Sequence, residues 1–251
     1  MTAESRRAFA ETMRSPEPDL GLACLLIGSE VFPDLDVSPS LAALDALAAS
    51  VEGADAGSVR EALQEFRGYG DDYADLRSSL LHEVLRRHRG LPITLSVVWL
   101  EVARRAGIPA AGIGLPGHFV VEVAGQLADP FYGGRLVSRA ELAQRIEGLR
   151  EAHFEPWDVP AIVTRVLGNV RAASATRERL RTRLWAVELS MLIPSHSVAL
   201  RRERGEILIQ LGDYLAAAFE LEAYAHAVAP VDPEAADHAL RAARMSRARL
   251  S

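Results

Sequence analysis

Apolar residues recur at helical spacing along the first part of the chain. Three segments, residues 4–13, 19–30 and 41–51, place apolar side chains three or four positions apart, which predicts three amphipathic helices. Two proline-containing stretches, residues 15–18 and 33–39, separate these segments. Serine hydroxyls at the ends of such stretches often accept a hydrogen bond from the first helical turn, so we expect Ser38 and Ser40 to cap the third helix. These helices would form a layer that covers one side of the next region.

A different pattern follows in the middle of the chain, where a long apolar helix leads into two short apolar strands. Pro92 suits the first turn of a helix, because its fixed φ is helical and its missing N–H needs no partner there. The helix is predicted over 93–106, and Gly107 and Pro109 are typical of its end. Residues 110–113 and 119–123 are then apolar stretches of strand length.

A tight turn near Gly125 makes a prediction about His118 and Asp129. If the turn has two residues, opposed positions of the hairpin sum to an odd number, so even positions before the turn share a face with odd positions after it. His118 and Asp129 then lie on one face, whereas a turn of three residues would separate them. A carboxylate beside an imidazole fixes the tautomer of the ring and stabilises its charged form.

Each of these two residues also has a purely structural interpretation. His118 on an apolar strand is often a hydrogen-bonded core histidine, and Asp129 directly before a proline is often a turn-forming residue. The spacing alone does not decide between a functional pair and two structural side chains.

Composition limits the class of protein. The chain has 251 residues, of which 49% are hydrophobic and 25% charged, as in globular proteins of one or two domains. The net charge of −6 argues against a nucleic-acid-binding protein. A single cysteine excludes an intramolecular disulfide and fits a reducing compartment, and neither a signal segment nor a membrane span is visible. We therefore expect a cytoplasmic protein.

Metal ligands are not indicated by the spacing of acidic and histidine residues. Asp71 and Asp72 follow a glycine turn without a third ligand nearby, which favours the start of a helix. Glu83 and His88 differ too much in helical phase to match the zinc motif that places two imidazoles on one face. We predict no metal and no cofactor.

The last part of the chain returns to helical spacing. Residues 198–231 resemble one tetratricopeptide repeat of 34 residues, with small residues where two antiparallel helices approach closely, and residues 161–194 resemble a degenerate copy. Phe154 and Trp157 lie in a Pro-rich stretch before them, which indicates a boundary that packs against the protein rather than a mobile linker. We therefore expect two domains, residues 1–155 and 156–251.

Several blocks of the middle region resemble the transglutaminase-like superfamily, and within it the bacterial SirB family, in which such a domain is followed by tetratricopeptide-like helices. The blocks are Gly90-Leu91-Pro92, Gly107-Ile108-Pro109-Ala110, Gly117-His118-Phe119 and Asp129-Pro130. The resemblance implies a mainly helical α+β fold, with a small antiparallel sheet packed on a central helix and C-terminal helical hairpins. Active members carry Cys, His and Asp in that order, and His118 and Asp129 match the last two.

The chain departs from the family pattern at the first of these three positions. The place of the nucleophilic Cys falls on Pro92, which has neither a nucleophile nor a side-chain proton. Cys24 lies in an apolar helical run, where a cysteine is usually a small buried hydrophobic residue. Ser96, one helical turn beyond Pro92, is an alternative nucleophile, although a buried helix serine commonly bonds a backbone carbonyl.

Two functions are compatible with these residues. The first is a non-catalytic transglutaminase-like protein that has kept His118 and Asp129 and binds or regulates another protein, through its helical-repeat region. The second is a hydrolase or acyl-transfer enzyme in which His118 is the general base, Asp129 orients it, and Ser96 or a water molecule is the nucleophile. Loss of the cysteine at Pro92 favours the first, and neither function involves nucleic acid or a membrane.

Overall fold

The chain folds into two compact units. The computed structural model describes residues 3–250, and the chain divides into Met1–Val166 and Leu167–Ser251. This division lies after Val166, later in the chain than the boundary expected at 155/156. Residues 156–157 form a strand in the sheet of the first unit. Within the described residues, none of the helices has both the length and the apolar character needed to cross a bilayer.

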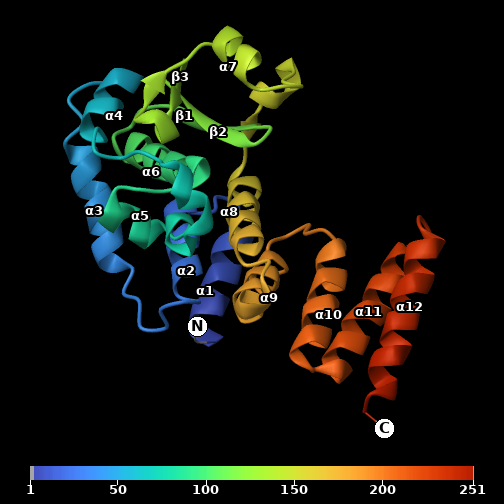
Figure 1. Ribbon diagram of the computed structural model, residues 1–251. Coiled ribbons are helices and arrows are strands. Elements are labelled where there is room, and N and C mark those ends of the chain that lie inside the picture. The colour runs from blue at the N-terminus through green and yellow to red at the C-terminus, as the bar shows by residue number, and fades with distance from the viewer. Residues whose placement is uncertain (1–2, 251) are drawn as a thin grey trace. The chain divides into compact units, whose positions relative to one another are not determined.

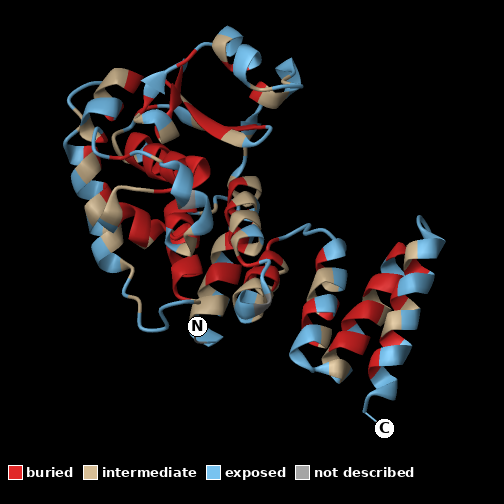
Figure 2. Cartoon of the chain, viewed as in Figure 1, coloured by how far each residue is buried: buried red, intermediate tan, exposed pale blue. Residues whose placement is uncertain are grey.

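The first unit is built around one apolar helix, α6 (Pro92–Arg105), in which every residue from Pro92 to Ala103 is buried (Figures 1 and 2). Helices α2, α3, α4 and α5 pack on it. Because this helix is buried on all sides, its sequence is mostly apolar all round instead of having one apolar stripe. The other helices of this unit are α1 (Ala3–Arg14), α2 (Leu20–Gly28), α3 (Ser38–Ala49), α4 (Ala56–Ala62), α5 (Leu81–Arg87) and α7 (Arg139–Arg145), with 3₁₀ turns η1 (Gly70–Ala74), η2 (Leu76–Ser79), η3 (Pro130–Tyr132) and η4 (Glu151–Phe154).

A five-stranded sheet in the order β4-β3-β2-β1-β5 covers α6, and each neighbouring pair is antiparallel. The strands are β1 (Ala110–Leu115), β2 (His118–Val123), β3 (Gln126–Asp129), β4 (Arg135–Leu136) and β5 (Pro156–Trp157). On one face, Ile113, Val120 and Leu127 pack against Leu142 of α7. Because side chains alternate along a strand, Phe119 and Val121 occupy the other face. The sheet thus lies between α6 and α7 (Figure 1).

The second unit consists of antiparallel helices. Helix α8 (Val159–Ala173) begins in the first unit and ends in the second, and it is followed by η5 (Arg177–Arg179), α9 (Leu180–Ser190), α10 (Ala199–Leu211), α11 (Tyr214–Val228) and α12 (Pro233–Ala248). Helix α10 approaches α11 closely at Gly205, where a Cβ atom would lie 2.8 Å from Leu221 Cγ. This small-residue contact is the packing expected of a tetratricopeptide hairpin. The mainly helical α+β fold class is confirmed.

One local prediction was wrong. Ser38 and Ser40 do not cap α3, because both lie inside the helix and its N-cap is Val37, whose side chain makes no capping bond. The first N–H of the helix, that of Ser38, instead donates to Asp36 Oδ1 at 2.9 Å. Pro39 in the first turn supplies the helical φ instead. Asp71 lies in the first turn of the 3₁₀ helix η1, in agreement with the helix start expected there, and its carboxylate accepts a hydrogen bond from Arg89 at 2.9 Å.

His82 on α5 gives the first unit a specific dependence on pH. Neither ring nitrogen has a hydrogen-bond partner among the described residues, and the ring contacts Phe32 edge-on at 5.1 Å. Burial lowers the pKa of His82 from 6.5, partly opposed by the carboxylate of Glu83. The unfolded chain therefore binds this proton more readily than the folded one, so stability is fully present above pH 6.5 and falls as the pH drops toward the folded pKa.

We expect His82→Phe to remove this part of the pH dependence. Urea denaturation of the wild type and of His82→Phe between pH 7.5 and pH 5 should show a smaller loss of unfolding free energy in the variant. Equal losses in the two proteins would contradict the assignment to His82.

Candidate functional site

His118 and Asp129 meet at the open end of the β2–β3 hairpin. Its turn is Ala124–Gly125, and both residues have positive φ, as a type I′ turn requires. Opposed residues such as Val123 and Gln126 sum to an odd number, which is the register expected from a two-residue turn. His118 Nε2 lies 2.8 Å from Asp129 Oδ2, so the predicted contact is present.

The burial of this pair differs between its two members. The Asp129 side chain is fully buried, whereas 15% of the His118 side chain is exposed. Asp129 Oδ1 is also buried, and it has no hydrogen-bond partner among the described residues. Among the described residues, His118 is therefore the side chain that compensates the buried charge of the Asp129 carboxylate. When Nε2–H donates to Asp129, Nδ1 keeps its lone pair and can accept a proton or a hydrogen bond.

Aromatic rings surround the exposed side of His118. The rings of Phe131 and Tyr132 in η3 lie with centroids 6.3 and 6.2 Å from the imidazole, and Tyr73 of η1 lies 6.2 Å from Phe131. Burial, then the nearby Tyr132 and Asp129, raises the pKa of Tyr73, while Arg165 opposes the shift. Tyr73 and Tyr132 are about half exposed. Tyr73, Phe131 and Tyr132 thus form an aromatic rim beside His118.

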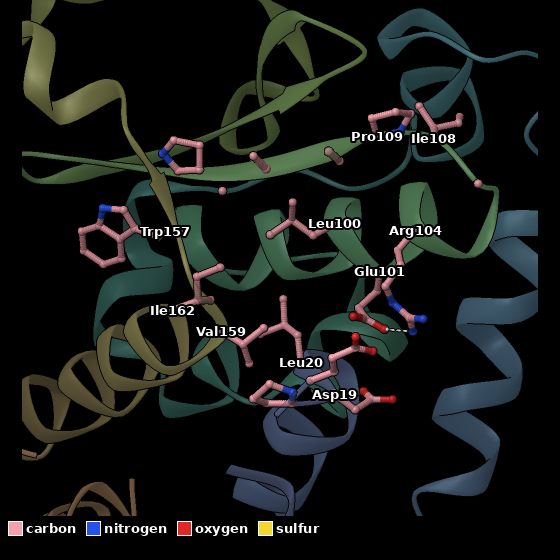
Figure 3. Close-up of a pocket in the computed structure, with 17 residues that line it drawn as sticks. Asp19, Leu20, Leu100, Glu101, Arg104, Ile108, Pro109, Trp157, Val159 and Ile162 are labelled. Atoms are coloured by element: carbon pink, nitrogen blue, oxygen red, sulfur yellow. Dashed lines mark hydrogen bonds and ion pairs between the residues drawn. The ribbon is translucent and has the colours of Figure 1, made fainter. Parts of the chain in front are cut away.

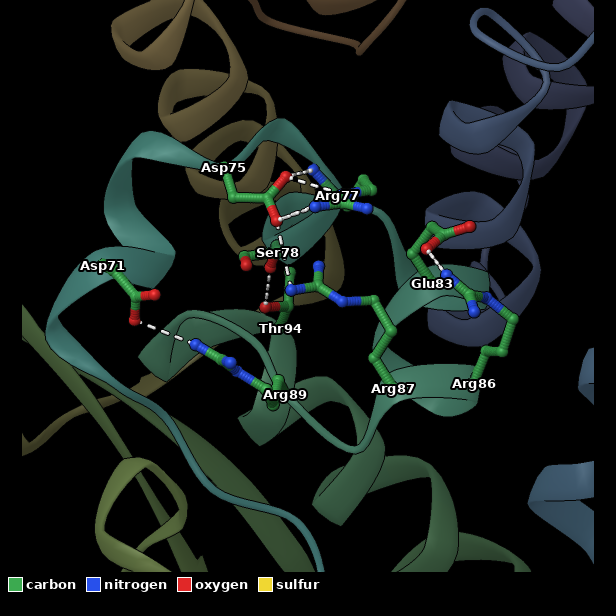
Figure 4. Close-up of polar contacts among 9 residues, drawn as sticks. All are labelled: Asp71, Asp75, Arg77, Ser78, Glu83, Arg86, Arg87, Arg89 and Thr94. Carbon is green, nitrogen blue, oxygen red and sulfur yellow. Dashed lines mark hydrogen bonds and ion pairs between the residues drawn. The ribbon is translucent and has the colours of Figure 1, made fainter.

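The N-terminus of α6 is held by hydrogen bonds that do not involve the side chain of Pro92. The Leu91 N–H donates to Thr94 Oγ1 at 3.0 Å, and the Thr94 hydroxyl donates to Ser78 O at 2.7 Å (Figure 4). Pro92 is buried in the first turn of α6, the position predicted for it from its fixed helical φ. The hydrogen bonds of Leu91 and Thr94 and the fixed φ of Pro92 thus both stabilise the start of α6.

A short segment joins this helix start to the aromatic rim. The Arg67 N–H donates to His88 O at 3.1 Å, and the Gly68 N–H donates to Phe131 O at 2.9 Å. A Cβ atom at Gly68 would lie 1.9 Å from the ring of Phe131, so only glycine permits this approach. Arg89 also stacks on the ring of Tyr69, at 4.3 Å to its centroid.

Ion pairs reinforce the same region. Arg77 and Arg87 both bond Asp75, at 2.9 and 3.1 Å, and Arg89 bonds Asp71 (Figure 4). The pairs made by Arg87 and Arg89 tie the η1–η2 region to the end of α5 and to the residues before α6.

The two hydroxyl and thiol candidates occupy structural environments. Ser96 is fully buried, and its hydroxyl donates to the Pro92 carbonyl at 2.8 Å, one turn earlier in the helix. Cys24 is buried in α2, where burial, and then the charges of Glu101 and Asp19, raise the pKa of its thiol far above the ordinary value. A thiol that resists ionisation is a poor nucleophile.

Within residues 3–250, no three His, Cys, Asp or Glu side chains are grouped so that they could hold a metal ion. The sequence analysis did not predict the aromatic rim. Two features of the sequence could have indicated it: Tyr69 and Tyr73 in a polar, glycine-containing segment, and Phe131-Tyr132 directly after Asp129-Pro130.

Comparison with known proteins supports the fold. The profile of the transglutaminase-like superfamily matches residues 40–168, and that of the tetratricopeptide repeat matches residues 170–247. The UPF0162 protein of Xylella fastidiosa is 34% identical over 174 residues, which are 63% of this chain and 62% of that protein. The UPF0162 protein of Pseudomonas aeruginosa is 32% identical over 187 residues, covering 67% of this chain and 69% of that one.

A shorter similarity extends to F-box only protein 21 of Mus musculus, which is 37% identical over 57 residues, or 23% of this chain and 9% of that protein. No solved structure matches the chain. This chain spans less than two thirds of the Xylella relative. With the superfamily profile covering half of the chain, and a SirB-type relative matched over most of its length, this chain belongs to the transglutaminase-like superfamily and carries tetratricopeptide repeats after that domain.

Proposed function

We propose that this protein is a non-catalytic, SirB-type member of the transglutaminase-like superfamily that binds or regulates another protein. The observation that carries the proposal is Pro92 at the start of α6. The resemblance to the superfamily assigns the cysteine of active members to this position. A proline there supplies no thiolate, and Ser96 directs its hydroxyl to a backbone carbonyl. His118 and Asp129 then serve to shape the hairpin and to contact a ligand.

The second unit supplies the surface for a protein partner, because tetratricopeptide helices generally mediate contacts between proteins. On α11, Leu215 and Phe219 are 60% and 64% exposed and lie four residues apart, hence on one face of the helix. Exposed apolar pairs of this kind are frequent in interfaces.

A hydrolysis assay distinguishes this proposal from the enzyme hypothesis. We expect the purified protein to hydrolyse thioester, ester and amide substrates no faster than background, and His118→Ala to leave that rate unchanged. A general base normally contributes ~10²–10⁴-fold to a rate, so a His118-dependent activity would be readily measured. Activity lost in His118→Ala and Ser96→Ala proteins that still melt cooperatively, but kept in Cys24→Ala, would contradict the proposal in favour of a serine hydrolase. Activity that survives Ser96→Ala but requires His118 would point to water as the nucleophile.

The binding half of the proposal is tested by cross-linking and affinity capture from the source cell. Leu215→Ala with Phe219→Ala should lose the captured partner while keeping the melting temperature of the wild type. Glu52→Gln with Glu61→Gln, two exposed residues of the first unit, provides the matched control. A partner retained equally by both double variants would place its binding site elsewhere.

A further inference from the structure

A cavity of about 750 Å³ lies at the opposite end of the sheet from His118. Ala110 and Ala111 of β1 line it, and Ala110 pairs with Val123 beside the hairpin turn, whereas His118 pairs with Leu115 at the other end of β1. The remaining walls come from the end of α6, the start of α2 and the start of α8, all within the first unit (Figure 3). Ligand pockets typically measure ~300–1,000 Å³, so this cavity can hold a small molecule.

One end of the cavity is apolar and rigid. Leu100, Val159 and Ile162 lead along its wall to Trp157 (Figure 3). Trp157 is fixed, because a Cβ atom at Gly114 would lie 2.2 Å from its ring atoms and because Phe119 packs against it edge-on at 5.6 Å. A preformed apolar wall favours the chain of an amphipathic ligand over a polar one.

The other end carries an excess of negative charge. Asp19, Glu101 and Arg104 lie there (Figure 3), and Glu17, two residues before Asp19 in the chain, also lines the cavity. Glu101 is buried and already compensated, since it accepts hydrogen bonds from Arg104 at 3.0 Å and from Arg105. Arg104 is thus engaged by Glu101. Asp19 Oδ1 accepts a hydrogen bond from the Leu22 N–H at 2.8 Å, which leaves Asp19 Oδ2 and the carboxylate of Glu17, both on exposed residues, to attract a cation.

We propose that this cavity binds a small amphipathic amine, with its ammonium group at Asp19 and Glu17 and its apolar chain extended toward Trp157. The separation of the two ends sets the orientation. An ammonium ion complements the excess of carboxylates, whereas a carboxylate head group would be repelled by them. The site is separate from His118, so it stands or falls independently of the function proposed above.

Isothermal titration of the full chain with octylammonium chloride at neutral pH, below the concentration at which the amine aggregates, tests the proposal. The expected result is saturable binding at one site. Octanoate and 1-octanol have the same chain length with a negative and a neutral head group, and both should bind at least ~10-fold more weakly.

Two sets of variants locate the site. Asp19→Asn with Glu17→Gln should weaken octylammonium binding by ~3–10-fold, since each partly exposed charge contributes modestly, and asparagine at residue 19 can still cap α2. Val159→Trp should abolish binding by filling the cavity. Glu52→Gln with Glu61→Gln, outside the cavity, should leave the affinity unchanged, and all variants should melt cooperatively near the wild-type temperature.

The absence of saturable octylammonium binding would overturn the proposal. Equal affinity for octanoate or octanol, or unchanged binding in folded Val159→Trp, would overturn it as well.

Discussion

His118→Ala is expected to lower the free energy of unfolding of the first unit by about 3–5 kcal/mol, the usual cost of removing one partner from a buried charged pair. Asp129 is fully buried, Oδ2 contacts His118 Nε2 at 2.8 Å, and Oδ1 has no other partner among residues 3–250. Without the imidazole, the carboxylate would be buried with neither of its oxygens compensated. Urea denaturation measures the loss, and hydrogen exchange over residues 118–129 assigns it to the hairpin.

A double variant separates the buried charge from simple loss of packing. In His118→Ala with Asp129→Asn, the orphaned group is neutral and close in shape to the carboxylate, so its burial costs less. We therefore expect the double variant to be more stable than His118→Ala alone. If the two proteins had the same stability, the penalty would come from the missing ring and not from the carboxylate.

Gly134→Ala should also destabilise the first unit strongly, by about 2–5 kcal/mol. Gly134 has a φ of +70°, which costs an L-residue about 1–2 kcal/mol. A Cβ atom there would also lie 2.2 Å from the ring of Trp99 and 2.8 Å from Arg60 Cγ. Overpacking of that kind costs typically ~1–3 kcal/mol more. Urea denaturation again gives the measurement.

The neighbouring Gly133 is a matched control. Its φ is +66°, yet a Cβ atom there would meet nothing within 4 Å. Gly133→Ala should therefore show only the backbone cost of about 1–2 kcal/mol. Similar losses at both glycines would mean that Trp99 moves aside without cost, and that the close approach of the turn to α6 contributes little.

Local patterns were sufficient to predict the central elements of the fold. The helix from Pro92 and the hairpin turn near Gly125 depend on residues close together in the chain. The register that joins His118 to Asp129 was predicted only for a turn of two residues, which is the turn that the structure has. The N-cap of α3 could not be predicted, because serine, proline and aspartate compete as start signals within residues 34–40 and Pro39 entered the first turn.

The surroundings of the candidate site were harder to predict, because they join distant segments. Nothing local to Asp71 indicates that its partner is Arg89, and nothing local to Gly68 indicates that Phe131 will cover it. The cavity beside Trp157 is lined by separate stretches from Glu17 to Ile162. Such features depend on tertiary packing, which hydrophobic periodicity does not specify.

The hairpin between His118 and Asp129 also has a consequence for the order of folding. Its two positive-φ turn residues bring the imidazole and the carboxylate together across only twelve residues of chain, so closing this loop has a small entropic cost. Hairpins form in about 1–10 μs, far sooner than contacts that wait for distant segments to dock. The His118–Asp129 contact can therefore arise during synthesis as soon as β3 has emerged, whereas the aromatic rim must wait until Gly68, Tyr73 and η3 are packed together.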